Sequence, residues 1–272
     1  MAIDSCLNQD KGDYELEVIV IDDGSTDNTP EVCKGYGDSI RYFRSANEGF
    51  EASLTKAVQY ADGDIICLLD ADDYFLSNKI NEVLKEFVKN KKLLFLFHDK
   101  ALIDKEGKVF KAYDKGGNTS TQSFKRAAAL DLLPAYNEQF FYTLYLAGHG
   151  YHLKKKLTYY RIHANSMSKP GNMYNWKREL VKVNVKHMRK LKTLMQHVPV
   201  WADTKLLNKI YAAIAGSHNY LKMEMALNRN KTAPAFKYYL RILYWDAQRR
   251  KINFYNIKFI ITYFILKRYV KY

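Results

Sequence analysis

The chain has 272 residues, 47% of them hydrophobic, which is enough to bury one sizeable core. Charged residues make up 26% of the chain, and the lack of Pro/Gly-rich or low-complexity tracts argues against wholesale disorder. Three widely spaced cysteines, Cys6, Cys33 and Cys67, argue against both a disulfide framework and a thiolate zinc site.

The formal net charge of +14 is unevenly distributed along the chain. Residues 171–272 hold 21 Lys and Arg against 4 Asp and Glu, a balance of +17. Residues 1–170 hold 22 against 25, a balance of −3. We therefore expect two regions with different partners: a first region, 1–170, that can hold a metal, and a basic second region, 171–272, that can face phosphate.

Neither a secretory signal nor a membrane-spanning segment is expected. Residues 1–15 carry no cationic start followed by an apolar run, and no stretch approaches the roughly 20 apolar residues that a spanning helix needs. The run from Phe259 to Leu266 is bracketed by Lys258 and Lys267, which indicates a segment that lies on a surface. The expectation is a cytoplasmic protein that can associate with the inner face of the membrane.

In chain order, short apolar runs alternate with helical patterns. Strands are expected at residues 16–21, 39–44, 64–69 and 93–98, and helices at 52–61 and 80–88. Alternating strands and helices predict an α/β fold with a doubly wound, mostly parallel sheet. The run 64–69 is apolar throughout, which predicts a strand buried on both faces.

The later elements are simpler. Residues 100–117 are typical of a polar hairpin with its turn at 104–107, 140–147 of a helix and 157–161 of an extended segment. Beyond residue 173 the pattern is helical, with Lys and Arg as spacers.

The run Asp70-Ala71-Asp72-Asp73 follows the apolar strand directly. Ligands of open α/β sheets bind at the carboxyl ends of the strands. Clustered carboxylates at such a position repel one another unless a cation is present, and oxygen ligands suit Mg²⁺ or Mn²⁺. The alternative is a solvated acidic turn that caps the helix at residues 78–88.

A second acidic loop, Asp22-Asp23-Gly24-Ser25, ends the β-branched strand at residues 16–21. The alternative here is an Asx-turn followed by a helix N-cap. Two acidic loops that each follow a strand are less expected by chance than one, and they would converge on one crevice if their strands are neighbours.

These motifs together resemble the ordered signature of family 2 glycosyltransferases. The matching segments are residues 18–29, Asn47-Glu48-Gly49, residues 61–73 and Tyr159-Tyr160-Arg161-Ile162-His163, with residues 2–9 resembling the helix that precedes the first motif. The resemblance covers about residues 2–170. Four motifs in this order are a specific signal.

The resemblance implies a GT-A (Rossmann-like) fold, a nucleotide-diphosphate-sugar donor, here expected to be a UDP-sugar, and a divalent metal. Asp70 and Asp72 would hold the donor and the metal, with Asp72 the more direct ligand. Arg161 and His163 would approach the diphosphate or the acceptor. The implied nucleotide-sugar-binding set is Asp22, Asp23, Gly24, Ser25, Asn47, Gly49, Asp70, Ala71, Asp72, Arg161 and His163.

The implied chemistry is an inverting displacement at the anomeric carbon, which needs a carboxylate base for the acceptor hydroxyl and a metal that neutralises the leaving diphosphate. The family's spacing places the base at Asn137, which cannot accept a proton. A slip of one residue places it at Glu138, which can. We predict that Glu138 is the base. The alternative is that Glu138 is only a helix-start residue, favoured there by the helix macrodipole.

The resemblance also implies a first strand, ahead of residue 2, that this sequence does not contain. Loss of a central strand leaves its two neighbours with unpaired backbone groups. An alternative function follows: a catalytically impaired GT-A relic that acts as an interaction module.

The basic region interleaves Lys and Arg with aromatic residues. Residues 252–272 combine an aromatic-aliphatic body with cationic flanks, which favours an anionic membrane surface and a lipid-linked or other glycan acceptor. The alternative is a helical bundle with a solvated basic face. Nucleic acid is not expected as a partner, because the sequence shows no recognition module.

Overall fold

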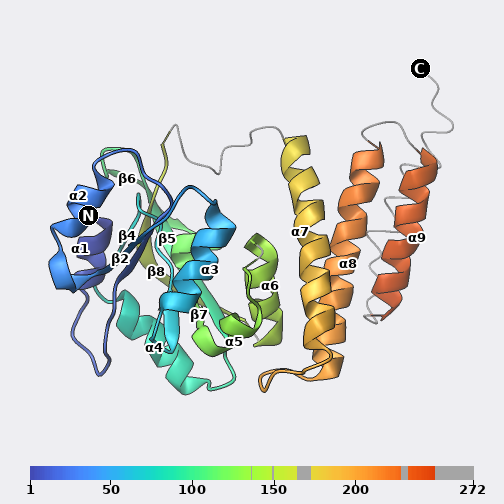
Figure 1. Cartoon of the computed structure of the whole chain (residues 1–272), viewed down its shortest axis with the longest axis horizontal. Helices are drawn as coiled ribbons and strands as arrows, with labels where there is room; N and C mark the ends of the chain where they lie inside the picture. Colours follow the sequence, from blue (N-terminus) through green and yellow to red (C-terminus); the bar gives the residue numbers. More distant parts are fainter. Residues whose placement is uncertain (136, 149, 164–172, 228–231, 249–272) are drawn as a thin grey trace. The chain divides into compact units, whose positions relative to one another are not determined.

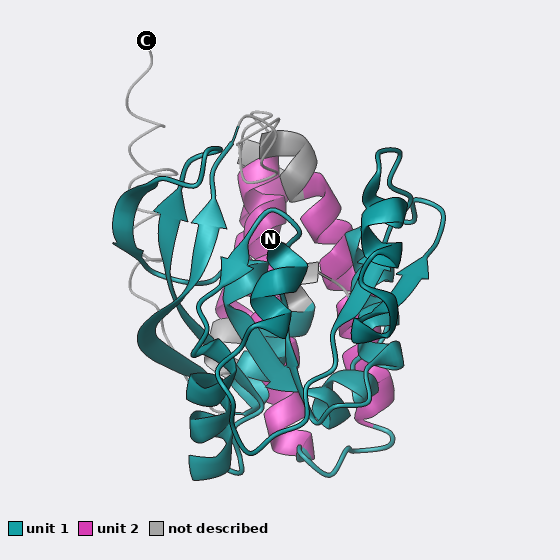
Figure 2. Ribbon diagram, turned by 90° about the vertical axis from the view of Figure 1, so that its left-hand side faces the viewer, with its two compact units in different colours: residues 1–170, 196–203 teal, residues 171–195, 204–272 magenta. Residues whose placement is uncertain are grey.

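The computed structural model describes the fold of residues 1–135, 137–148, 150–163, 173–227 and 232–248. The chain divides into two compact units, which Figure 2 colours separately. The first, the sheet unit, contains residues 1–170 and 196–203, and the second, the helical unit, contains residues 171–195 and 204–272. Each unit is considered by itself.

The sheet unit begins with alternating helices and strands (Figure 1). They are α1 (Ala2–Leu7), β1 (Ile19–Asp22), α2 (Thr29–Lys34), a 3-10 turn (Gly37–Ser39), β2 (Arg41–Arg44) and α3 (Phe50–Tyr60). Strands β1 and β2 pair in parallel as a two-stranded sheet. Pro30 lies in the first turn of α2, where its missing amide hydrogen has no intrahelical partner to lose.

A six-stranded sheet forms the rest of this unit. Its elements are β3 (Ile65–Cys67), β4 (Tyr74–Phe75), α4 (Lys79–Lys89), β5 (Phe95–Ile103), β6 (Val109–Asp114), a 3-10 turn (Thr119–Thr121), β7 (Gln122–Lys125), α5 (Arg126–Asp131), α6 (Asn137–Ala147) and β8 (Tyr151–Arg161). The strand order is β3-β7-β5-β8-β4, with β6 paired to β5. Strands β5 and β8 are parallel, and the other pairings of this sheet are antiparallel.

The core of the sheet unit lies where helices cover the six-stranded sheet. Val83 and Phe87 of α4 pack with Leu93, Leu96 and Leu157, all of them buried. α4 presents these side chains because its apolar residues recur three and four positions apart. Phe124 of β7 meets Phe140 of α6 edge to face, with ring centroids 5.6 Å apart.

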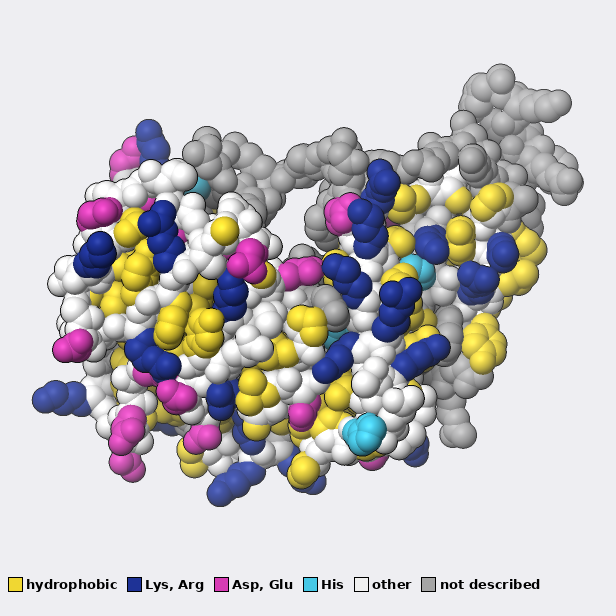
Figure 3. Space-filling view, viewed as in Figure 1, with side chains coloured by type: hydrophobic (Ala, Val, Ile, Leu, Met, Phe, Trp, Pro, Cys, Tyr) yellow, Lys and Arg dark blue, Asp and Glu magenta, His cyan; other side chains and the backbone are white. Residues whose placement is uncertain are grey.

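The described part of the helical unit contains α7 (Met173–Leu194), α8 (Thr204–Leu227) and α9 (Thr232–Gln248). α8 packs against both α7 and α9. Buried Met223 and Ala226 of α8 meet Ala235, Tyr239 and Ile242 of α9. Figure 3 shows Lys and Arg side chains gathered over α7 and α8, in agreement with the basic composition of this part of the chain.

Several expected elements are confirmed in the structure, including the helices near residues 52–61, 80–88 and 140–147 and the hairpin of β5 and β6. The expectation for residues 64–69 was wrong in part, because β3 covers only Ile65–Cys67 and its residues are half-buried. Strand β8 begins at Tyr151, earlier than expected. Residues 252–272, expected to lie on a surface, are outside the described residues.

No helix among the described residues is both long and apolar enough to cross a lipid bilayer. Cys6, Cys33 and Cys67 are free thiols.

Candidate functional site

Strand β1 ends in Asp22, whose side chain is held by three neighbours. The carboxylate accepts hydrogen bonds from the Tyr42 hydroxyl and, at 2.7 Å, from the Ser25 backbone amide, and Arg44 lies 3.4 Å away. Burial alone would raise the pKa of Asp22, but these hydrogen bonds and the Arg44 charge outweigh burial, and its pKa is lowered. Asp22 is therefore an ionised, fixed group at the end of the strand.

Asp23 joins the first acidic loop to the start of α3. Its two carboxylate oxygens each accept a backbone amide, from Glu48 at 2.8 Å and from Gly49 at 2.8 Å. Gly24 has φ +84°, and a Cβ there would lie 2.8 Å from the Asn47 amide nitrogen. The segments 22–25 and 47–49 thus form one folded loop pair, with the Asn47 side chain exposed at its surface.

The second acidic loop follows β3. Asp70 is half-buried, and burial together with the charge of Asp72 raises its pKa to about 6. The Asp70 backbone amide donates to the Ser120 hydroxyl oxygen at 3.0 Å, and that hydroxyl donates to the Asp73 carboxylate. Asp73 is buried, and burial raises its pKa to about 7.

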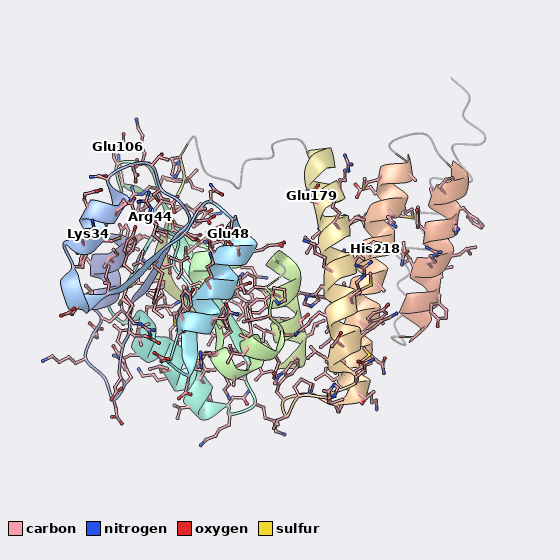
Figure 4. The ribbon with its side chains drawn as sticks, viewed as in Figure 1. Lys34, Arg44, Glu48, Glu106, Glu179 and His218 are labelled. Carbon is pink, nitrogen blue, oxygen red and sulfur yellow. The ribbon has the colours of Figure 1, made fainter. Side chains whose placement is uncertain are left out.

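Residues at the end of β8 contact this second loop. The Arg161 backbone amide donates to Asp73 at 2.8 Å, and its guanidinium donates to the backbone carbonyls of Asp72, Asp104 and Lys105 at 2.8–2.9 Å. His163 Nε2 lies 2.9 Å from Asp72 Oδ2. Both β8 residues are thus beside the Asp70–Asp73 loop, and Arg161 ties that loop to the β5–β6 turn, near Glu106, which Figure 4 labels.

The two candidates for the base begin a helix. Asn137 is the first residue of α6, and Glu138 follows it. Their side chains lie outside the described residues, so the choice between Asn137 and Glu138 stays a prediction.

The structure therefore assembles the expected residues in two sets. The first set comprises Asp22, Asp23, Gly24, Ser25, Asn47 and Gly49, and the second comprises Asp70, Ala71, Asp72, Arg161 and His163. Strands β1 and β3, which lead into the two acidic loops, line one cavity, to which β1 contributes Ile21 and the second loop contributes Asp70 and Ala71. Figure 4 shows Arg44 and Glu48, neighbours of the first set, at the same upper end of the sheet unit as Glu106.

The donor atoms in the second set can be tested against a divalent cation. Among the described residues, no three His, Cys, Asp or Glu side chains are grouped so that they could hold a metal ion. Asp70 and Asp72 supply two carboxylates. This number fits Mg²⁺, which commonly takes one or two carboxylates and completes its shell with water and substrate phosphates.

The sequence did not predict the contacts of Tyr42 with Asp22, of Ser120 with Asp70 and Asp73, or of Asp73 with Arg161. Asp73 carried a signal, because it is the third carboxylate of the motif. Tyr42 and Ser120 carried none, since each reaches its acidic partner only after β2 pairs with β1, or after residues 119–121 fold beside the second loop.

The chain is similar to a known family and to several known proteins. The family model for glycosyl transferase family 2 matches residues 1–144. A chondroitin synthase of Pasteurella multocida (strain Pm70) and a hyaluronan synthase of Pasteurella multocida are each 38% identical over 110 residues, which is 39% of this chain and 11% of the relative. The chain therefore matches only about a tenth of the length of these relatives.

Among solved structures, S. aureus TarS 1–349, crystallised in complex with UDP-GlcNAc, superposes with a TM-score of 0.55 at 14% identity, over 92% of this chain and 87% of that one. At this identity the likeness concerns the fold, which is the α/β GT-A fold that the sequence predicts. Because the family model covers more than half of the 272 residues and all the motifs before α6, the chain belongs to glycosyl transferase family 2.

Proposed function

We propose that this protein transfers a sugar from a UDP-sugar donor to a glycan or lipid-linked acceptor, with inversion and with the help of Mg²⁺ or Mn²⁺. The observation that carries the proposal is the half-buried Asp70 beside Asp72 at the carboxyl end of β3. Burial and the Asp72 charge both oppose the ionised form of Asp70, and a bound cation would reverse that balance. The complex of S. aureus TarS with UDP-GlcNAc supports a UDP-sugar as the donor class.

In the proposed reaction, an acceptor hydroxyl oxygen attacks the anomeric carbon while the bond from that carbon to the diphosphate oxygen breaks. A base at the start of α6, Glu138 in our proposal, takes the hydroxyl proton. A cation held by Asp70 and Asp72 would neutralise the charge that develops on the leaving diphosphate. The first set of residues would bind the nucleoside, with Asp22 or Asp23 toward the base or ribose.

We propose more specific parts for Arg161 and His163 within this reaction. The Arg161 guanidinium already donates to three backbone carbonyls, so its proposed part is to hold the metal-binding loop in position. His163 contacts Asp72 directly. We assign His163 to the diphosphate side of the site, where it orients the Asp72 carboxylate.

The proposal is tested by calorimetric titration of UDP into the purified chain, with and without Mn²⁺. Metal-dependent binding is expected, because the two carboxylates and the diphosphate would share one cation. Binding that is equal with and without Mn²⁺ would contradict the metal assignment. A folded chain that does not bind UDP would favour the alternative of a GT-A relic that serves as an interaction module.

A further inference from the structure

The β5–β6 hairpin carries an exposed apolar surface that the proposed reaction does not yet use. Residues 109–113 of β6 are all exposed, although successive side chains of a strand point to opposite faces. Val109 is 42% exposed, Phe110 60% and Tyr113 54%. An antiparallel strand commonly packs one face on the core, so apolar side chains gathered in this way indicate a binding surface. We call residues 108–115 the hairpin surface.

The hairpin adjoins the Asp70–Asp73 loop. The Arg161 guanidinium donates to the carbonyls of Asp104 and Lys105 in the β5–β6 turn, at 2.9 and 2.8 Å. The same guanidinium donates to the Asp72 carbonyl at 2.9 Å. In Figure 1, β6 lies at the upper end of the sheet unit, where Figure 4 labels Glu106 of the turn. A molecule bound along β6 would therefore have one end beside this acidic loop.

Tyr113 is held in place by its hydroxyl group. That hydroxyl donates to the carboxylate of Asp99, which is fully buried and also accepts a hydrogen bond from His152 Nε2 at 2.7 Å. The ring of Tyr113 is thus exposed while its far end is fixed. A ligand that packs on this ring would cost the side chain little rotamer freedom, which favours binding.

Two cations of the hairpin surface are available to a negatively charged ligand. Lys105 and Lys111 have carboxylate partners, at 3.3 and 2.6 Å. Lys108 and Lys115, which are exposed at the two ends of β6, form no ion pair within the described part of the chain. The surface therefore combines exposed aromatic rings with two lysines whose charge a carboxylate could neutralise.

Two other occupants fit this combination less well. Within the described sheet β6 pairs only with β5, so a second copy could add a strand there. Lysine and irregular register oppose such pairing, and β6 contains Lys111 and shows register shifts against β5. An anionic lipid surface would also meet the carboxylates of Glu106 and Asp114 on the same hairpin, which would repel it.

A sugar ring suits the surface better. The C–H face of a sugar ring is apolar and packs on an aromatic ring, while the hydroxyl groups at its edge stay hydrated. A carboxylate on the sugar would pair with a lysine. We propose that the hairpin surface binds the acceptor of the reaction, and that this acceptor is a glycan containing acidic sugars. A sugar ring lies on Phe110, with carboxylates toward Lys108 and Lys115. This inference rests on the proposed sugar transfer, because it assigns the acceptor site.

The test is a calorimetric titration, at low salt and without donor, of the full chain with a hexasaccharide in which glucuronic acid alternates with N-acetylglucosamine. Phe110→Ala should weaken binding about tenfold, and Lys108→Gln about threefold. Phe110→Tyr keeps an aromatic ring and should bind like the parent. Tyr220→Ala, which removes an exposed tyrosine of α8, is the matched control and should also bind like the parent.

A neutral hexamer of N-acetylglucosamine should bind about tenfold more weakly than the acidic hexasaccharide, because it leaves both lysines unpaired. Equal affinities for the two would overturn the acidic class. No binding of the acidic hexasaccharide, or undiminished binding in Phe110→Ala, would remove the glycan from this surface. Weaker sedimentation of Phe110→Ala with anionic vesicles would assign the surface to lipid instead. Titration of the same variants with UDP and Mn²⁺ reports on the donor site separately, so failure of the acceptor site is distinguished from failure of the proposed transfer.

Discussion

At the scale of single residues, the site is governed by carboxylates whose surroundings differ. Asp22 is stabilised as an ion by Tyr42, Ser25 and Arg44, whereas burial and a neighbouring charge work against the ion at Asp70. A carboxylate whose ionised form is disfavoured by its surroundings is stabilised more by a bound cation than a carboxylate that already pairs with arginine. The metal is therefore expected at the Asp70–Asp72 loop and not at Asp22.

The first prediction concerns Asp72. Asp72→Asn should reduce metal-dependent sugar transfer by at least about a hundredfold, because it removes the more direct ligand of the proposed cation. Asp64→Asn, at the opposite end of β3, is the matched control and should retain activity. Transfer is measured with a UDP-sugar and Mn²⁺, and circular dichroism checks the fold. Normal turnover in Asp72→Asn would remove Asp72 from the metal site.

The second prediction concerns pH. The raised pKa of Asp70, about 6, means that the folded protein holds this proton more tightly than the unfolded chain does, and a metal must displace it. Mn²⁺-dependent UDP binding should therefore strengthen about tenfold between pH 5 and pH 7.5. Calorimetry at several pH values measures it. Asp70→Asn should bind weakly with a flatter profile, and an identical slope in this variant would assign the effect to another group.

At the scale of elements, the position of the first loop depends on a glycine. Gly24→Ala would place a Cβ 2.8 Å from the Asn47 amide nitrogen, at φ +84°. We expect a loss of about 2–3 kcal/mol in the free energy of unfolding, from backbone strain plus the contact. Gly37→Ala is the matched control, because Gly37 has φ +51° and nothing within 4 Å of its Cβ position.

Gly37→Ala should lower the free energy of unfolding by only about 1 kcal/mol, from the backbone strain alone. Urea unfolding measures both variants. Equal losses would show that the close approach of residues 24 and 47 adds nothing to stability.

A second feature at this scale is a clamp formed by Glu17, just before β1. Its carboxylate accepts hydrogen bonds from the backbone amides of Asp62 and Gly63, at 2.6 and 2.7 Å, and from the Arg41 guanidinium at 2.7 Å. Burial raises its pKa, but the Gly63 and Asp62 amides and Arg41 outweigh burial and lower it. The stabilisation is therefore present above the unfolded pKa of Glu17 and is lost as pH falls through the lower, folded value.

Glu17→Ala should lower the free energy of unfolding by about 1 kcal/mol at pH 7, a modest value because the clamp is partly exposed. The cost should shrink in acid. Glu15→Ala, an exposed neighbour, is the control. Thermal unfolding at pH 7 and pH 3 measures the difference, and a cost that is the same at both pH values would contradict an ionic clamp.

Periodicity predicted the helices well because α3 and α4 each present a regular apolar face. It failed at β4 and β7. Strand β4 has only two residues, and β7 reads Gln-Ser-Phe-Lys, which is recognisable as a strand only through its pairing with β3 and β5. Strand β3 is shorter and less buried than its apolar run suggests because one of its edges faces the cavity. The acidic motifs were readable because local sequence places them directly after strands.

Across the molecule, the sheet unit contains all the motifs, and the helical unit contains the excess positive charge. Residues 171–272 have a balance of +17, and Figure 3 shows many of these cations over α7 and α8. The family assignment rests on residues 1–144. A role for the basic region in meeting an anionic surface is thus a separate proposal, with its own test.

Deleting residues 252–272 should release the protein from vesicles that contain anionic lipid. The deletion removes the aromatic and aliphatic residues of this segment together with Lys258, Lys267, Arg268 and Lys271. Each cation near such a surface is worth about 1 kcal/mol. A full-length variant with these four cations changed to Gln separates charge from apolar contact. It should bind more weakly than the parent and lose most of its dependence on salt. Sedimentation with anionic and neutral vesicles measures both variants. If the deleted chain still sediments fully with anionic vesicles, residues 252–272 are not the membrane contact, and the contact is assigned to the basic residues that remain in 171–251.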